Sequence, residues 1–279
     1  MIYRFFSTKR THCAVVMMAC VWWYFSVCVA HAAYPDKPIK VIVPFAPGGG
    51  TDLVARTLAV PMGGDLRQAI VIDNKPGGST IIGTDALAKS PPDGYTLVVA
   101  TLAHAVNPSL KTKLPYSQDV DFAPVILVGV SPNIVVVSEN SPYKTFAEFL
   151  AAAKANPGKL SYASQGGGTS AHLAGELFNS LAGTKLTHVP YKGAAPALND
   201  VIGGSVDLAI LSVPSVLPLV NGGKLKPVAV TTAKRSPMLP DTPAMREYVT
   251  GFELTNWFAL VVPAATPADI RNRLHGEVV

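Results

Sequence analysis

The chain has little cysteine, and all of it lies at one end. Cys13, Cys20 and Cys28 fall within the first thirty of the 279 residues. Beyond that segment the sequence offers no disulfide, no thiolate nucleophile and no cysteine-based metal site. Charged residues make up only 15% of the chain, which is low for a cytosolic protein, whereas hydrophobic residues make up 49% and supply a large core.

Several catalytic motifs are also missing. The sequence contains no G-x-x-x-x-G-K-[ST] phosphate loop, no G-x-G-x-x-G dinucleotide motif, no G-x-S-x-G nucleophile elbow and no H-E-x-x-H zinc motif. The histidines after the first 32 residues are His104, His172, His188 and His275, and they are widely spaced. We therefore expect neither a cofactor nor a metal site, and no catalytic residue is assigned.

Residues 1–32 have the pattern of a signal peptide. A basic start, an apolar run and an A-x-A cleavage site follow one another, as Arg4, Lys9 and Arg10, residues 14–30, and Ala30-His31-Ala32. Cleavage is expected before Ala33, so the mature protein would be exported. An uncleaved membrane anchor is the alternative, although the apolar run is short for a span. A lipoprotein is a weaker alternative, because neither Cys20 nor Cys28 follows a good lipobox.

Removal of this segment nearly neutralises the chain. The whole sequence has 23 basic and 18 acidic residues and a net charge of +5. Without the three basic residues of the leader, 20 basic residues face 18 acidic ones, which leaves a net charge of about +2. The basic character thus belongs largely to the leader, and we expect no nucleic-acid partner.

After residue 34, short β-branched runs alternate with helical stretches, which predicts an α/β fold with a parallel sheet. We expect two lobes: residues 33–130 together with 232–279, and residues 131–231. The strand over 125–137, broken at Ser131-Pro132, is expected to enter the second lobe, and the strand over 226–231 to return. The other expected strands are 39–43, 69–72, 95–100, 160–163, 187–190, 206–211 and 257–262.

Two glycine-rich loops stand out, each between an expected strand and an expected helix. The first glycine loop is Pro47-Gly48-Gly49-Gly50-Thr51-Asp52, and the second is Ser164-Gln165-Gly166-Gly167-Gly168-Thr169-Ser170. Each places unpaired N–H groups of a helix N-terminus at the carboxyl end of a strand, where open α/β sheets bind ligands and where an anion is favoured. If the lobes face each other, the two loops would enclose one ligand.

The polar residues around these loops allow more than one role. Asp52 and His172 could form an acid–base pair across a cleft, but each more simply hydrogen-bonds its own loop. Lys192 could pair with an anion or lie in solvent at a turn. Tyr191 could stack on a ligand or pack between Pro190 and Gly193.

Six motifs, taken together, resemble those of the Bug (TctC-like) solute receptors, the extracytoplasmic subunits of tripartite tricarboxylate transporters. The motifs follow one another with sensible spacing, and the resemblance covers the chain from about residue 34 to its end. They are residues 34–52 with the first glycine loop, then 74–78, 92–97, 162–173, 188–198 and 203–207.

The resemblance implies a two-lobed periplasmic binding protein fold, of the Venus flytrap, type II-like kind. It also implies a periplasmic receptor that captures a small organic acid and passes it to small and large membrane subunits. We expect this receptor to be a monomer. Family members continue for some tens of residues beyond the equivalent of Val279. We therefore expect a C-terminally short first lobe.

The resemblance also implies ligand-binding residues on both glycine loops and beside them. Thr101, which follows an expected strand, and His172, which follows the second loop, are added to them. The candidates are Phe45, Pro47, Gly48, Gly49, Thr51, Asp52, Ser79, Thr80, Thr101, Ser164, Gln165, Gly168, Thr169, Ser170, His172, Tyr191 and Lys192. The main hypothesis is a transport receptor. A periplasmic enzyme using Asp52 and His172, and a ligand sensor without a transport role, are the alternatives.

Overall fold

The structure is a computed structural model that describes residues 34–279. The expected signal peptide, its cleavage site and the three cysteines lie outside the described residues. Lys37–Val279 form one unit, and the fold below is the fold of that unit. Across residues 34–279, no helix is both long enough and apolar enough to cross a membrane.

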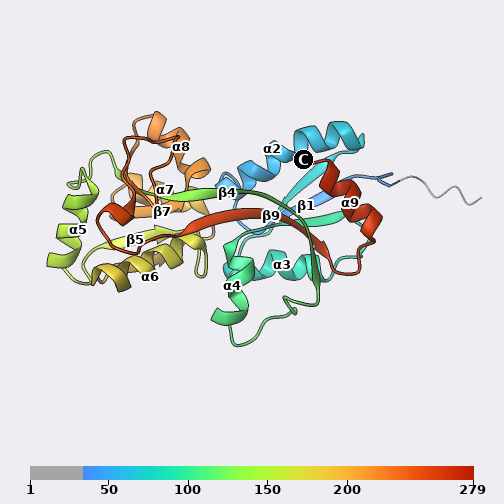
Figure 1. Cartoon of the computed structure of the whole chain (residues 1–279), viewed down its shortest axis with the longest axis horizontal. Coiled ribbons are helices and arrows are strands. Elements are labelled where there is room, and N and C mark those ends of the chain that lie inside the picture. The colour runs from blue at the N-terminus through green and yellow to red at the C-terminus, as the bar shows by residue number, and fades with distance from the viewer. Residues whose placement is uncertain (1–33) are drawn as a thin grey trace, which may run out of the picture. The chain divides into compact units, whose positions relative to one another are not determined.

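The first lobe is an α/β sheet with strand order β2-β1-β3-β9-β4. Helix α2 packs on one face of the sheet and α3 on the other, with α9 against β4 (Figure 1). Its elements are β1 (Ile39–Val43), α2 (Gly50–Leu66), β2 (Ile70–Asn74), α3 (Ile81–Ala88), β3 (Thr96–Ala100), α4 (Leu102–Leu110), β4 (Phe122–Ser138), β9 (Thr255–Pro263) and α9 (Ala268–Gly276).

The second lobe is built on the C-terminal half of β4. There β4 pairs with β7 and β8, and β5 lies between β7 and β6. The other elements are α5 (Phe146–Ala155), β5 (Ser161–Ser164), α6 (Ser170–Ala182), β6 (Thr187–Pro190), α7 (Ala194–Ile202), β7 (Leu208–Ser212), α8 (Val213–Asn221) and β8 (Leu225–Val230). The sheet is therefore mixed rather than parallel, because β4 runs antiparallel to β7, β8 and β9.

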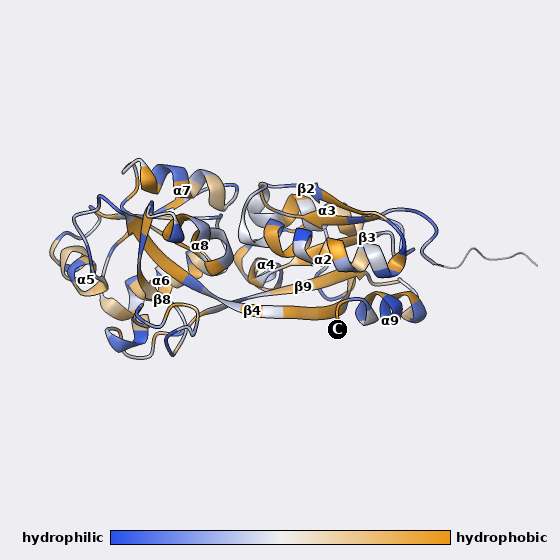
Figure 2. Cartoon of the chain, turned by 90° about the horizontal axis from the view of Figure 1, so that it is seen from above, coloured by the Kyte–Doolittle hydropathy of each residue, from blue (hydrophilic) through white to orange (hydrophobic). Residues whose placement is uncertain are grey.

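Two antiparallel strands connect the lobes. β4 runs for 17 residues without the expected break and pairs with β9 from Phe122 opposite Pro263 to Pro132 opposite Thr255 (Figure 1). Pro132 is tolerated because it lies at the end of this pairing, where a missing N–H costs little. Figure 2 shows β4 turning bluer and paler between two orange ends, as its hydrophobic halves enter the two lobes.

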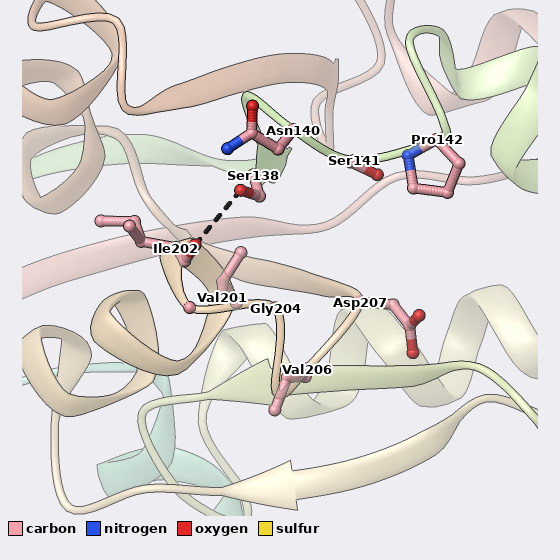
Figure 3. Close-up of a pocket in the computed structure, with 10 residues that line it drawn as sticks. Ser138, Asn140, Ser141, Pro142, Val201, Ile202, Gly204, Val206 and Asp207 are labelled. Atoms are coloured by element: carbon pink, nitrogen blue, oxygen red, sulfur yellow. Dashed lines mark hydrogen bonds between the residues drawn. The ribbon is translucent and has the colours of Figure 1, made fainter.

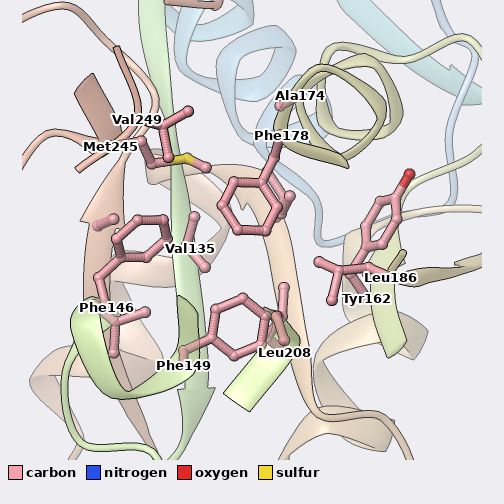
Figure 4. Packing of buried hydrophobic residues seen from close by; sticks show 14 of the residues in the cluster. Val135, Phe146, Phe149, Tyr162, Ala174, Phe178, Leu186, Leu208, Met245 and Val249 are labelled. Atoms are coloured by element: carbon pink, nitrogen blue, oxygen red, sulfur yellow. The ribbon is translucent and has the colours of Figure 1, made fainter. Parts of the chain in front are cut away.

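The expected return strand lies elsewhere. β8 pairs with β4 inside the second lobe, so the return to the first lobe is made by β9. Met245, Val249 and Phe252 also pack with Phe146 in the second-lobe core (Figure 4). The lobe boundaries stay a prediction, but this packing favours a return near Leu254 rather than at residue 232.

Two helices were not predicted from the sequence, and both contain proline. α4 contains Pro108 near its C-terminal end. α8 has Pro214 in its first turn, where proline is well tolerated, and Pro218 inside it. In a sequence, proline usually indicates the end of a helix, because it lacks the N–H that bonds to the preceding turn. Each of these helices has only nine residues, so few of its hydrogen bonds depend on the turn that contains proline.

Candidate functional site

The first glycine loop is held by Asp52. Gly48 has φ +81°, a left-handed conformation that favours glycine, and Gly48 N–H donates to Asp52 Oδ2 at 3.0 Å. Arg56 Nε donates to the same oxygen at 2.9 Å, and Asn74 Nδ2 donates to Oδ1 at 3.0 Å. Burial raises the pKa of Asp52, but hydrogen bonds from Arg56, Gly48 and Asn74 outweigh it and leave the pKa below its ordinary value. Asp52 is thus committed to its own loop.

The second glycine loop repeats this arrangement with different chemistry. Gly168 has φ +75°, and its N–H donates to Nδ1 of His172, four residues later, at 3.0 Å. Thr169 is the N-cap of α6, and its Oγ1 accepts from the His172 N–H at 3.4 Å. An imidazole nitrogen therefore occupies the place that a carboxylate oxygen occupies in the first loop.

A second histidine supports this loop from behind. The rings of His172 and His188 stack with centroids 4.2 Å apart, and His188 also stacks on Tyr162 at 4.8 Å. His188 Nε2 lies 2.6 Å from Ser164 Oγ. Burial, then the charge that His172 can carry, lowers the pKa of His188 to about 4, and burial is also the main cause of a lowered pKa at His172.

A cavity of about 260 Å³ lies beside the two loops. It combines backbone from glycine-rich turns with hydroxyl, amide and ammonium groups, and Lys192 is the one charged residue of its lining. The lining residues are Pro44, Phe45, Gly77, Gly78, Ser79, Thr80, Gln165, Gly166, Gly167, Pro190, Tyr191 and Lys192.

Part of this lining is held in a strained backbone conformation. Ser79 has φ +58° and Thr80 has φ +76°, and the second value is unusual for a β-branched residue. Asn107 on α4, which is fully buried, clamps both: its Nδ2 donates to Ser79 O at 3.0 Å and to Thr80 Oγ1 at 3.2 Å. Each strained residue costs about 1–3 kcal/mol, and such strain is concentrated at ligand sites.

The lobes touch around the cavity. Ala46 N–H donates to Lys192 O at 3.0 Å, and Gly50 N–H donates to Ser215 Oγ at 2.7 Å. The first glycine loop thus packs against the starts of α7 and α8. The second glycine loop approaches Ser79 and α4 instead, with Gly167 close to Ser79 Oγ. The two lobes are therefore in direct contact around the cavity, an arrangement that we call closed.

Six of the expected ligand residues line the cavity: Phe45, Ser79, Thr80, Gln165, Tyr191 and Lys192. The others are not among the lining residues, and most of them are buried: Pro47, Gly48, Gly49, Thr51, Asp52, Thr101, Ser164, Gly168, Thr169, Ser170 and His172. Sequence reasoning missed Pro44, Gly77, Gly78, Gly166, Gly167 and Pro190, although all six belong to motifs that it singled out. Which of these residues contact a ligand stays a prediction.

The expected acid–base pair has no support in the geometry. Asp52 and His172 each bond their own loop, and within residues 34–279 no hydrogen bond or ion pair joins the two side chains. The Tyr191 hydroxyl donates to Asp200 at 2.5 Å. Burial, then Asp200, raises the pKa of Tyr191 to about 12, so this hydroxyl stays neutral. Residues 34–279 contain no group of three or more side chains suited to hold a metal.

A second cavity, of about 230 Å³, lies on the second lobe between the end of β4 and the end of α7 (Figure 3). Its lining includes Ser138, Asn140, Ile202 and Asp207. The Asp207 carboxylate accepts from the N–H and the hydroxyl of Ser161, both at 2.8 Å. With a carboxylate as its one charged group, this cavity is a poor match for an anion.

Comparison with known proteins places the chain in a family. Residues 54–278 match the tripartite tricarboxylate transporter family receptor. Protein BugT of Bordetella pertussis is 38% identical over 245 residues, which is 87% of this chain and 75% of BugT.

Two solved structures are similar over most of their length. An R. palustris protein solved with adipate has a TM-score of 0.85 and 38% identity, covering 88% of this chain and 83% of that one. MatC from Rhodopseudomonas palustris, with bound malate, has a TM-score of 0.82 and 33% identity, covering 88% of this chain and 84% of MatC. The fold, the paired glycine loops and these similarities agree: the chain belongs to the Bug receptors of tripartite tricarboxylate transporters, a family of two-lobed periplasmic solute receptors.

Proposed function

We propose that this protein is a periplasmic receptor that captures a small organic dicarboxylate in the cavity beside its glycine loops. The observation that carries the proposal is the chemistry of the lining. It offers hydroxyl, amide and backbone groups and one ammonium, from Lys192, and it contains no carboxylate. Such a set attracts anions and repels none.

The energetics favour an anion that is bound without an arginine. A buried carboxylate without partners would cost several kcal/mol. Residues 77–80 of the lining lead into α3, and residues 190–192 lead into α7. Each helix N-terminus contributes about 0.3–1 kcal/mol to binding a nearby anion. Hydroxyls of Ser79 and Thr80 add hydrogen bonds, and Lys192 adds a charge at the rim.

The relatives point to the class of ligand. One solved relative carries adipate and another carries malate, and both ligands have a carboxylate at each end. Lys192 lies in the cavity lining, and none of the ion pairs among residues 34–279 involves its ammonium. We assign this ammonium to the second carboxylate of the ligand.

The same geometry supports binding rather than catalysis. Asp52 and His172, the residues of the alternative enzyme hypothesis, are both occupied in loop architecture. A receptor without catalysis must release its ligand unchanged, which neutral donors permit. Delivery to small and large membrane subunits, and export by a cleaved signal peptide, are parts of this proposal.

Calorimetric titration with matched acids tests it. Adipate, malate and citrate are compared with hexanoate, which has a single carboxylate. We expect a dicarboxylate to bind with the highest affinity and to be recovered unchanged. Failure of every acid to bind a protein with a cooperative unfolding transition would contradict the proposal, and conversion of the acid would favour the enzyme alternative.

A further inference from the structure

The second glycine loop forms one wall of the cavity, and two histidines hold that wall from behind. Gln165, Gly166 and Gly167 line the cavity. On the far side of the loop, the Gly168 N–H is bound by His172, as described above. Ser164 Oγ accepts from the Gly166 N–H at 3.1 Å and contacts His188 Nε2 at 2.6 Å. The wall is thus attached at both ends to imidazole rings.

The bond from Gly168 requires an unprotonated nitrogen. Nδ1 of His172 accepts this hydrogen bond at 3.0 Å, and a proton on Nδ1 would remove the lone pair and set two N–H groups against each other. The other nitrogen, Nε2, lies 4.0 Å from Glu176 Oε1, and the His172 side chain is 24% exposed. Because Nδ1 is the acceptor, the neutral ring carries its proton on Nε2. A second proton from solvent can therefore go only to Nδ1, where it breaks the bond to Gly168.

The charged and titratable groups near His172 and its partner His188 come from four parts of the fold. Glu176 lies one turn along α6 and favours the protonated form of His172, whereas Lys111, just after α4, opposes it. His188 on β6 stacks on the ring, and a charge on either histidine opposes a charge on the other. Tyr162 on β5 stacks on His188 and donates its hydroxyl to Glu176 at 2.7 Å. Burial of the two rings and the repulsion between their charges thus favour a neutral pair.

We propose that His172 and His188 are positioning residues that hold the cavity wall only as a neutral stacked pair, so that mild acid releases the ligand. This inference rests on the proposed function. The pKa of His172 is lowered in the closed structure, mainly by burial, and an open loop would restore its ordinary value of about 6.5. Affinity is therefore full above about pH 6.5 and falls as the pH drops below it.

The test is a titration of adipate by calorimetry between pH 7.5 and pH 5.5, with four proteins. For the wild type we expect affinity to fall by about tenfold per pH unit below about 6.5, the slope for one linked proton. H172N keeps a short acceptor, as Asp52 does in the first loop, without a titrating nitrogen; it should bind at pH 7.5 and lose most of the slope. H172A should bind weakly throughout.

H275N is the matched control, because His275 is an exposed histidine of α9; it should keep the wild-type slope. Comparison at the same pH cancels the ionisation of adipate itself. An equal slope in the wild type and H172N would overturn the inference while leaving the proposed function intact. No binding of adipate, malate or citrate by folded wild type at pH 7.5 would overturn the proposed function and this inference with it.

The amide resonance of Gly168 gives a second readout without ligand. In the wild type it should shift with the titration of His172, and in H172N it should not. A Gly168 resonance that does not respond to pH in this range would contradict the assigned hydrogen bond. A purely structural role of His172 would lower stability in H172N and H172A alike and leave the pH slope unexplained.

Discussion

The two glycine loops have the same local geometry but are held by different kinds of group. In each, a left-handed glycine precedes the N-cap of a helix, and the side chain of the third helical residue accepts from that glycine's N–H. In the first loop the acceptor is the Asp52 carboxylate, and in the second it is the His172 imidazole. The same backbone motif can thus be held by an acceptor that stays charged or by one that can be protonated, and a single side chain decides which.

The locations of the loops match this difference. The first glycine loop packs on the opposite lobe through Gly50 and Ser215, and its carboxylate keeps its charge at any pH above the ordinary range of an aspartate. The second glycine loop forms the cavity wall and is held by a histidine, the residue type whose unperturbed pKa is nearest to neutrality. The loop that is held by a carboxylate thus lies at the lobe contact, and the loop that is held by an imidazole lies at the cavity.

The largest loss of stability is expected from Asp52→Ala. This change leaves Gly48 N–H and Asn74 Nδ2 without their acceptor in a part of the loop where the Asp52 side chain is nearly inaccessible. We expect a loss of about 3 kcal/mol in the free energy of unfolding, measured by urea denaturation. Asp119→Ala, at an exposed position, should change it by less than about 0.5 kcal/mol.

The contribution of Asp52 to the free energy of unfolding should persist over most of the accessible pH range. Because the pKa of Asp52 is lowered in the folded protein, its contribution is complete above the unfolded value of about 3.9 and is lost only below it. Equal stability losses for Asp52→Ala and Asp119→Ala would break the comparison, because the first loop would then need no fixed anchor.

Gly50→Ala should act on closure rather than on the loop itself. An added Cβ would overlap Ser212 Oγ and lie 2.9 Å from Ser215 Oγ, across the lobe contact. We expect a loss of about 2 kcal/mol in the binding free energy of a dicarboxylate, measured by calorimetry. Gly64→Ala on α2 meets no neighbouring atom and should raise stability by about 1 kcal/mol without a change in affinity. Wild-type affinity in Gly50→Ala would show that the lobe contact is dispensable.

Lys192→Met tests which side of the cavity supplies charge. The side chain length is kept and the ammonium is removed, so the affinity for adipate should fall by about tenfold, or about 1.4 kcal/mol, while the affinity for hexanoate stays unchanged. Lys185→Met, at an exposed position, is the control. Parallel losses for both acids would mean that Lys192 acts on the fold or on the common carboxylate.

The smallest effect on stability is expected from His172→Ala. One neutral hydrogen bond, partly open to water, is lost, and we expect a loss of about 1 kcal/mol in urea denaturation at pH 7.5. That loss should shrink as the pH falls, because the wild-type bond itself breaks. A loss as large as that of Asp52→Ala would contradict the view that the second loop is the weaker and reversible one.

Much of the fold could be predicted from local patterns. The β-branched runs mark β1, β3 and β7, and the glycine loops lead into α2 and α6 as expected. The helix α8 and the unbroken β4 could not be predicted, because proline in a sequence signals a break and only the tertiary pairing shows that it is tolerated. The return through β9 depends on register between distant segments.

The candidate site was predicted less completely, for a similar reason. The interpretation of Asp52 as a brace for its own loop needs only residues nearby in sequence, and it is confirmed. The clamp by Asn107 joins positions 28 residues apart, and the stacking of His172 on His188 depends on how α6 sits over β6. Nothing in the local sequence marks these residues as partners.

The long pairing of β4 with β9 also sets an order of assembly. β9 lies between β3 and β4 in the first-lobe sheet, yet it comes from Thr255–Pro263. A chain that emerges from its N-terminus can complete the second lobe first, since β5, β6, β7 and β8 follow β4 in sequence. The first lobe must wait until β9 has been made, which raises contact order and slows its folding. The lobe that begins the sequence is thus the last to become native.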